Sequence, residues 1–292
     1  MPNEPLLSWS DPVKELISFL ALFLAAGAIG FRFSALRRAR VEADRPLYDD
    51  AASRAARLGA VGALVSLIAL AVALPGLASR KHLGVVAFVS SDISTLIQVS
   101  CLVLAVIGFV LAASRYSAGW VAAAIGVIVG ALRAGLLGQW SRLVNPIHSL
   151  AAGLWIGTLF VLVVVGLGSL VRYEQGRDRR ATIAADMINA FSPLALSMGA
   201  VVVCFGLITA WRHLHVLSNL WSTAYGYALM VKLALAAMVF ALGAWNWRRQ
   251  RPLLGTDEAA SSIRRSATSE LVVAALVLVA TAVVVSLPAP KG

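Results

Sequence analysis

The chain has 292 residues, of which 60% are hydrophobic and only 13% charged. Since a soluble globular protein is about a quarter charged, this chain has too few charges to cover a water-facing surface. The composition excludes a disordered chain and a secreted disulfide scaffold, and it indicates a protein whose main solvent is the lipid bilayer. The two cysteines, Cys101 and Cys204, both lie in apolar stretches, so no structural disulfide is expected.

Eight stretches are long and apolar enough to cross a bilayer, which takes about 20 residues of helix. In chain order they are about 14–36, 57–78, 94–113, 118–138, 147–171, 191–211, 225–247 and 269–287. Because the backbone in lipid must satisfy its hydrogen bonds within the segment, each stretch is predicted to be an α-helix. We therefore expect an all-α, polytopic membrane helix bundle with about eight transmembrane helices. It divides into a four-helix half over residues 1–139 and a second four-helix half over residues 140–292.

The net charge is +11, but the Lys and Arg residues cluster in loops between the apolar stretches, as in membrane proteins. The charge therefore does not indicate a nucleic-acid partner. Seventeen of the 25 Lys and Arg residues lie in alternate loops, six lie on the opposite side and two lie within spans. Positive residues favour cytoplasmic loops, so both termini are predicted to be periplasmic. Five tryptophans near span ends are typical of interfacial anchors: Trp140, Trp211, Trp221, Trp245 and Trp247.

The loops between the spans carry no catalytic signature. They contain no Gly-rich phosphate loop, no Cys-x-x-Cys pair and no soluble domain. The chain has neither a His-Glu-x-x-His motif nor a recognisable Ser-His-Asp set. We therefore expect no enzymatic activity.

All four histidines fall at or near the predicted outer face. His82 lies in the second loop, His148 opens the fifth span, and His213 and His215 close the sixth. Imidazole is the commonest metal ligand, so these side chains are candidate metal ligands. The alternative is that they lie at headgroup level, as Trp and Tyr do. We favour a functional role for His148, because Trp155 follows seven residues later on the same helix face.

Ionisable and polar side chains inside a bilayer are costly and usually functional. Tyr225, Lys232 and Asn246 are spaced so that they lie on one stripe of the seventh span, and this stripe is predicted to face the bundle interior. The alternative for Lys232 is that its ammonium reaches outward to the headgroups, and this reading is favoured for Arg133 in the fourth span. Candidate counter-charges and hydrogen-bonding partners at the same level are Glu15, Asp92 and Gln98.

Sulfur-containing side chains in the second half add candidate soft ligands. Met198 lies in the sixth span and Met230 in the seventh. Thioethers suit Cu(I), so both are candidate metal ligands. The alternative is that they only fill space in the bundle, which is the commoner role of methionine in an apolar helix.

Two segments of the second half resemble a known family. NPIHSLAAGLWIG, residues 145–157, and FSPLALSMGAVVVCFGLITAW, residues 191–211, are similar to neighbouring spans of the copper-resistance protein D (CopD) family. The similarity covers about residues 140–250, so the 140–292 half is expected to be CopD-like. Matching family positions are His148, Trp155, Gly157, Tyr225, Gly226, Lys232 and Asn246.

The resemblance implies an inner-membrane protein of bacterial copper transport and homeostasis. It would move or deliver copper, as Cu⁺ or Cu²⁺, from the periplasmic side toward the cytoplasm, often beside a periplasmic copper-binding partner of the CopC type. Two features depart from the family pattern. No fused periplasmic copper-binding domain precedes the spans, and Thr158 stands where many members have a second glycine.

Two other functions are compatible with this pattern. A haem-binding, electron-transfer subunit would need two histidines inside one cavity, and only His148 is placed for that, so haem is not expected. An assembly factor for a copper enzyme would need no transport at all.

Overall fold

A computed structural model describes residues 9–38, 42–171, 179–214, 216–250 and 257–288. Within these residues the chain is helical and contains no β-strand. Eight helical stretches are long and apolar enough to cross a membrane: Ser10–Arg37, Arg45–Ser79, Ile93–Ala113, Ser117–Leu136, Trp140–Leu170, Arg180–Leu214, Ala224–Arg248 and Ala267–Ser286. The predicted all-α bundle of about eight transmembrane helices is therefore confirmed, and the chain is a membrane protein.

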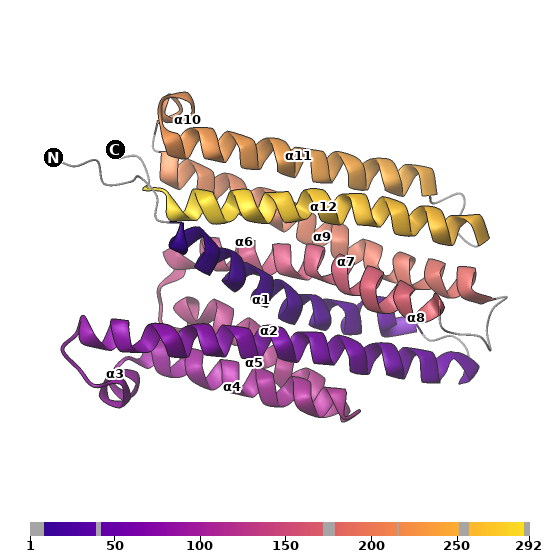
Figure 1. Ribbon diagram of the computed structural model, residues 1–292, viewed down its shortest axis with the longest axis horizontal. Helices are drawn as coiled ribbons and strands as arrows, with labels where there is room; N and C mark the ends of the chain where they lie inside the picture. Colours follow the sequence, from indigo (N-terminus) through magenta and orange to yellow (C-terminus); the bar gives the residue numbers. More distant parts are fainter. Residues whose placement is uncertain (1–8, 39–41, 172–178, 215, 251–256, 289–292) are drawn as a thin grey trace.

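The helices are labelled as in Figure 1. The first four spans are built from α1 (Ser10–Phe33), α2 (Arg45–Ser79), α4 (Ile93–Ala113) and α5 (Ser117–Leu136). The last three are built from α9 (Arg180–Leu214), α11 (Ala224–Gln250) and α12 (Asp257–Ser286). Two short helices, α3 (Val85–Ser91) and α10 (Asn219–Ser222), lie at the end of the bundle where α1 begins and α12 ends. Charge placement predicts that this end faces outward.

The fifth span is a chain of short helical pieces rather than one regular helix. A 3₁₀ turn leads into α6, and two π-helical segments then alternate with α7 and α8. The pieces are Trp140–Leu143, α6 (Val144–Ala152), η4 (Gly153–Gly157), α7 (Thr158–Val161), η5 (Leu162–Leu167) and α8 (Gly168–Val171). π-Helical turns are rare and often lie at functional sites. The first of them begins five residues after His148.

The first and fifth spans are the most buried and lie between two groups of helices. One group contains α2, α4 and α5, and the other contains α9, α11 and α12 (Figure 1). Helix α1 contacts α2 on one side, and η4, α7 and α12 on the other. The contacts of α1 therefore join the two groups. The predicted division into a half over residues 1–139 and a half over residues 140–292 stays a prediction.

Small residues let α1 and the fifth span approach each other closely. A Cβ atom added to Gly27 would lie 2.3 Å from the carbonyl carbon of Gly157, so the two backbones are in direct contact there. Thr158 is fully buried next to this contact, and its hydroxyl donates to the main-chain oxygen of Gly27 at 3.4 Å. A Cβ on Gly30 would lie 2.0 Å from the Thr158 hydroxyl oxygen. The threonine is therefore accommodated because α1 carries a glycine opposite it.

Two helices extend beyond the apolar segments that predict them. Helices α2 and α9 begin at Arg45 and Arg180, about eleven residues before the predicted spans. Polar contacts accompany these extensions at the predicted cytoplasmic end. Asp50 and Arg54 form an i, i+4 ion pair at 2.8 Å, and Arg179 pairs at 2.6 Å with the buried carboxylate of Asp44. Apolar periodicity alone does not report such extensions, because their stabilising contacts are polar.

The outer surface of the bundle is apolar, as a lipid-facing surface requires. Large side chains such as Val72, Val86 and Leu196 are exposed along the helices. The five tryptophans predicted as interfacial anchors are all at least half exposed, and each lies close to the end of a span. Both cysteines are free, Cys101 buried and Cys204 exposed, in agreement with the absence of a predicted disulfide.

Candidate functional site

One face of α9 makes polar contacts with the start of the fifth span. Five residues spaced by three or four positions form it: Met198, Val202, Gly206, Thr209 and His213. Residues at this spacing lie along one side of a helix. We call this row the α9 stripe. It runs from the middle of the bundle toward the predicted outer end, and it contacts α6 through Val202, Gly206 and Thr209 and α11 through His213.

His148 projects from α6 onto the centre of the α9 stripe. Its Nδ1 atom lies 3.0 Å from the main-chain oxygen of Val202. Since a carbonyl oxygen only accepts hydrogen bonds, the neutral imidazole that makes this bond carries its proton on Nδ1. The lone pair is then on Nε2. Metal-binding histidines have this arrangement, because the second ring nitrogen donates to a carbonyl and fixes the ring.

Gly206 makes room for the imidazole. A Cβ at this position would lie 3.0 Å from Cε1 and 3.4 Å from Nδ1 of His148. A larger residue at position 206 would therefore press on the ring. The glycine lets α6 approach α9 closely enough for the imidazole to reach the carbonyl oxygen of Val202.

His213 repeats the same bonding pattern at the outer end of the stripe. Its Nδ1 atom lies 2.8 Å from the main-chain oxygen of Thr209, so the neutral ring again leaves Nε2 with the lone pair. The ring stacks on that of Tyr225 from α11, with centroids 6.2 Å apart and planes 17° apart. From Gly206 to His213 is roughly 10 Å along the helix axis. The two histidines therefore contact one stripe at different depths.

Polar contacts also hold the start of the fifth span against the end of α9. The Thr209 hydroxyl donates to the Asn145 side-chain oxygen at 2.9 Å. Arg212 donates to the main-chain oxygen of Ser141 at 2.6 Å. Because Asn145 and His148 are three residues apart on α6, both face α9. These bonds fix the segment that carries His148.

Lys232 of α11 completes the surroundings of His148. Its side chain is partly buried, and it is close enough for its charge to act on the imidazole. Trp155, seven residues after His148, packs on Phe240 of α11 with ring centroids 4.6 Å apart. The residues that follow His148 thus bring α11 against this side of the bundle.

The structure places the other two residues of the predicted α11 stripe apart from His148. Tyr225 is buried near the outer end, where it packs with Leu214, Leu229 and Val284. Asn246 lies near the opposite end of α11, and its side-chain amide donates to a carboxylate oxygen of Glu270 on α12. The stripe on α11 therefore contacts several neighbours in succession.

Asp92 acts on Arg133 through its charge, without direct contact. Within the described part of the chain, no ion pair joins Arg133 or Lys232 to the carboxylate of Glu15 or of Asp92. Asp92 instead caps α4, accepting hydrogen bonds from the hydroxyl and main-chain nitrogen of Thr95 at 2.5 and 2.9 Å. These two hydrogen bonds lower the pKa of Asp92 below its ordinary value. Arg133 lines a separate cavity with Gln98, between the first four spans and α6.

The remaining candidate ligands differ in their surroundings. His82 is exposed in the turn after α2, with a positive φ of 56°, and His215 lies outside the described residues. Met198 is partly buried on the α9 stripe, one turn inward from Val202, and Met230 is partly buried on α11. Among the described residues, no group of three or more His, Cys, Asp or Glu side chains is arranged to hold a metal ion.

Sequence reasoning missed three participants. The main-chain oxygen of Val202 carries no sequence signal, because every residue has one. Thr209 looks like an ordinary hydroxyl in an apolar helix until its partner Asn145 is known. Glu270 did carry a signal, since an acidic residue inside a predicted span is itself a candidate functional residue.

The comparison with family models points to the second half of the chain. Residues 185–284 match the family model described as Copper resistance protein D. The chain is also 30% identical over 148 residues to the copper transport protein CutJ of Bacillus subtilis (strain 168). That match covers 51% of this chain but spans only a quarter of the length of the relative. No solved structure matches the chain. Residues 185–284 of this membrane protein are therefore similar to the copper resistance protein D family.

Proposed function

We propose that this protein handles copper at the bacterial inner membrane, taking it up on the periplasmic side and moving or delivering it toward the cytoplasm. A general role in copper transport or resistance is supported by the family match and by the named function of the relative. The direction rests on the predicted orientation, in which the ends of α9 and α12 face outward. Copper is the substrate in this proposal, and no enzymatic step is expected.

The hydrogen bond from His148 to Val202 is the observation that carries this proposal. It fixes the ring and leaves Nε2 as a donor for a metal ion. No carboxylate or thiol cluster competes for this role among the described residues. A bound imidazole and a nearby thioether suit copper better than hard cations such as Mg²⁺.

The order of donors along the α9 stripe supports inward movement. His213 lies at the outer end, His148 contacts the centre, and Met198 lies one turn, roughly 6 Å, further in. Imidazole binds both copper oxidation states, whereas thioether sulfur prefers Cu(I). We therefore infer that copper enters on the histidines already as Cu(I) and reaches the methionine without a change of oxidation state.

Lys232 would control entry to this path. A positive charge near His148 opposes a bare copper cation, so its side chain must move or the metal must arrive with other ligands. A periplasmic copper-binding protein of the CopC type would supply the metal in bound form. Replacing Lys232 with Met removes the charge and is expected to raise the copper affinity at His148. Lys232→Arg keeps the charge and is expected to leave the copper affinity as in the unmodified protein.

The test compares His148→Ala with His82→Ala, whose side chain is exposed in a turn away from the α9 stripe. Both variants would be assayed for copper content after purification, for cellular copper, and for copper flux into liposomes that contain this protein alone. We expect His148→Ala to lose bound copper and flux while His82→Ala retains both. Equal behaviour of the two variants would contradict the role of His148. Copper binding without flux in the unmodified protein would instead support an assembly factor.

A further inference from the structure

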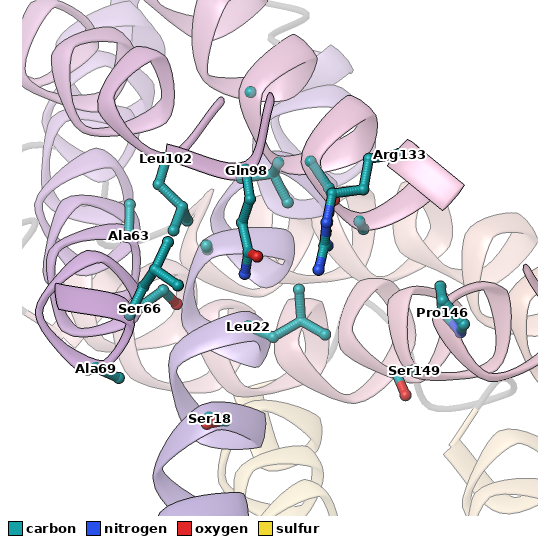
Figure 2. A pocket seen from close by; sticks show the side chains of 16 residues that line it. Ser18, Leu22, Ala63, Ser66, Ala69, Gln98, Leu102, Arg133, Pro146 and Ser149 are labelled. Atoms are coloured by element: carbon teal, nitrogen blue, oxygen red, sulfur yellow. Dashed lines mark hydrogen bonds between the residues drawn. The ribbon is translucent and has the colours of Figure 1, made fainter. Parts of the chain in front are cut away.

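A second polar site lies in the first half of the bundle, across α6 from the α9 stripe. It is a cavity of about 410 Å³ bounded by α1, α2, α4, α5 and α6. This volume is within the range of small-ligand sites. Its polar lining consists of Ser18, Ser66, Gln98, Arg133 and Ser149, and the rest is apolar (Figure 2). The cavity is therefore suited to a ligand with one polar group.

The two faces of α6 keep this cavity apart from His148. Pro146 and Ser149 line the cavity, whereas Asn145 and His148 contact α9. Each pair is spaced by three residues and so shares a face of the helix. The cavity and the α9 stripe can therefore be tested independently.

Arg133 brings a positive charge into the cavity without a fixed partner. One guanidinium nitrogen donates to the main-chain oxygen of Gly130 at 2.9 Å. Its Nε atom is buried and makes no hydrogen bond with any described residue. Asp92, whose charge acts on Arg133, forms no ion pair with it and is already bonded to Thr95. A charged group in a membrane is costly unless it is compensated, so the cavity favours an anion.

Gln98 extends the set of donors. Figure 2 shows its amide and the Arg133 guanidinium pointing into the same space, toward Leu22 of α1. The Gln98 side chain makes no hydrogen bond with the described residues, so both of its N–H groups are available there. No acidic side chain is among the described residues that line the cavity. A guanidinium beside an amide and hydroxyls is the donor set that binds oxygen anions, and it repels metal cations.

We propose that this cavity binds an oxyanion, a phosphate or carboxylate group held by Arg133 and Gln98. Such a group has two sources, an anionic phospholipid headgroup or a small free anion. The rest of the lining is apolar and lies between membrane helices. It can therefore hold either the acyl chains of a lipid or the apolar part of a small anion.

Two probes separate these sources, both on the purified full-length protein. Inorganic phosphate is titrated while thermal unfolding is followed, and native mass spectrometry measures retention of phosphatidylglycerol from nanodiscs of defined composition. Saturable stabilisation by phosphate identifies a free anion, and selective retention of phosphatidylglycerol over phosphatidylcholine identifies a headgroup. If the unmodified protein shows neither, the proposal is wrong.

Arg133→Gln and Arg142→Gln form the matched pair of variants. Arg142 is exposed outside the cavity and donates to Gln139 at 2.9 Å. Losing a charge-assisted bond should weaken binding roughly ten- to a hundredfold in Arg133→Gln and leave Arg142→Gln unchanged. Binding that survives in Arg133→Gln would overturn the assignment. If that variant does not fold, Gln98→Leu keeps the charge and should still weaken binding, and unchanged binding there would overturn the assignment as well.

Discussion

The Nδ1 atom of His148 lies 3.0 Å from the main-chain oxygen of Val202, although 54 positions separate the two residues. This contact joins α6 to α9 and sets which ring nitrogen of His148 can bind a metal. It depends on the missing side chain at Gly206, one turn further along α9. The position of the His148 ring therefore depends on a residue that has no side chain of its own.

Gly206→Ala tests this dependence. The added Cβ would lie 3.0 Å from Cε1 of His148, so the ring must give by a few tenths of an ångström, and we expect its bond to Val202 to lengthen. Disturbing such an outer partner typically costs 10–100-fold in metal affinity, and we expect a loss near the lower limit, about tenfold. Competition with a Cu(I) chelator measures it. Gly76→Ala is the control, because a Cβ there meets no atom within 4 Å; equal affinities of the two variants would refute the explanation.

Gly27→Ala is expected to destabilise the whole bundle. The new Cβ would lie 2.3 Å from the carbonyl carbon and 2.4 Å from the carbonyl oxygen of Gly157. Backbone atoms cannot rotate away, so α1 and the fifth span must separate. Overpacking usually costs about 1–3 kcal/mol, and we expect the upper part of this range. Thermal unfolding in detergent measures the loss, with Gly76→Ala again as control. A melting temperature unchanged from that control would mean that the two helices do not touch there.

Asn246 and Glu270 are hydrogen-bonded, so the effects of replacing them on the free energy of unfolding are expected to be coupled. Asn246→Leu removes the donor and leaves a partly buried carboxylate without it, which should cost about 1–3 kcal/mol. Adding Glu270→Leu removes the stranded carboxylate, so the double variant should be more stable than Asn246→Leu alone. Unfolding measured for both single variants and the double variant gives the coupling. Simple additivity of the two changes would contradict the pairing.

Asp92 is expected to stabilise the start of α4 in a pH-dependent way. Its hydrogen bonds with Thr95 lower its pKa in the folded protein, so the stabilisation is present above the ordinary aspartate value of about 4. It is lost as the pH falls through the lowered pKa. Asp92→Ala should cost about 0.5–2 kcal/mol at neutral pH, and the difference from the unmodified protein should narrow in acid.

Thr95→Val provides a second measurement of this cap. It removes the hydroxyl donor but keeps the main-chain bond, so the Asp92 pKa should rise toward its ordinary value. The acid loss of stability should then begin at a higher pH than in the unmodified protein. Identical acid profiles for Thr95→Val and the unmodified protein would show that the hydroxyl bond does not contribute.

The sequence by itself determined the number of spans, their approximate limits and the interfacial tryptophans. These depend on local properties, since crossing a bilayer requires about 20 apolar residues and each helix satisfies its own backbone. Helical geometry also placed Tyr225, Lys232 and Asn246 on one stripe before any partner was known. The copper proposal likewise began from sequence, through segments around His148 and Phe191.

Only the tertiary structure decided which side chains meet. It brought His148 to Val202 and Asn246 to Glu270, it left Arg133 in a cavity of its own, and it gave Asp92 to the cap of α4. Contacts of this kind depend on how closely two helices approach, and glycines at 27, 157 and 206 set that approach. A periodic pattern reports which face of a helix is polar. It cannot report which distant backbone oxygen that face will touch.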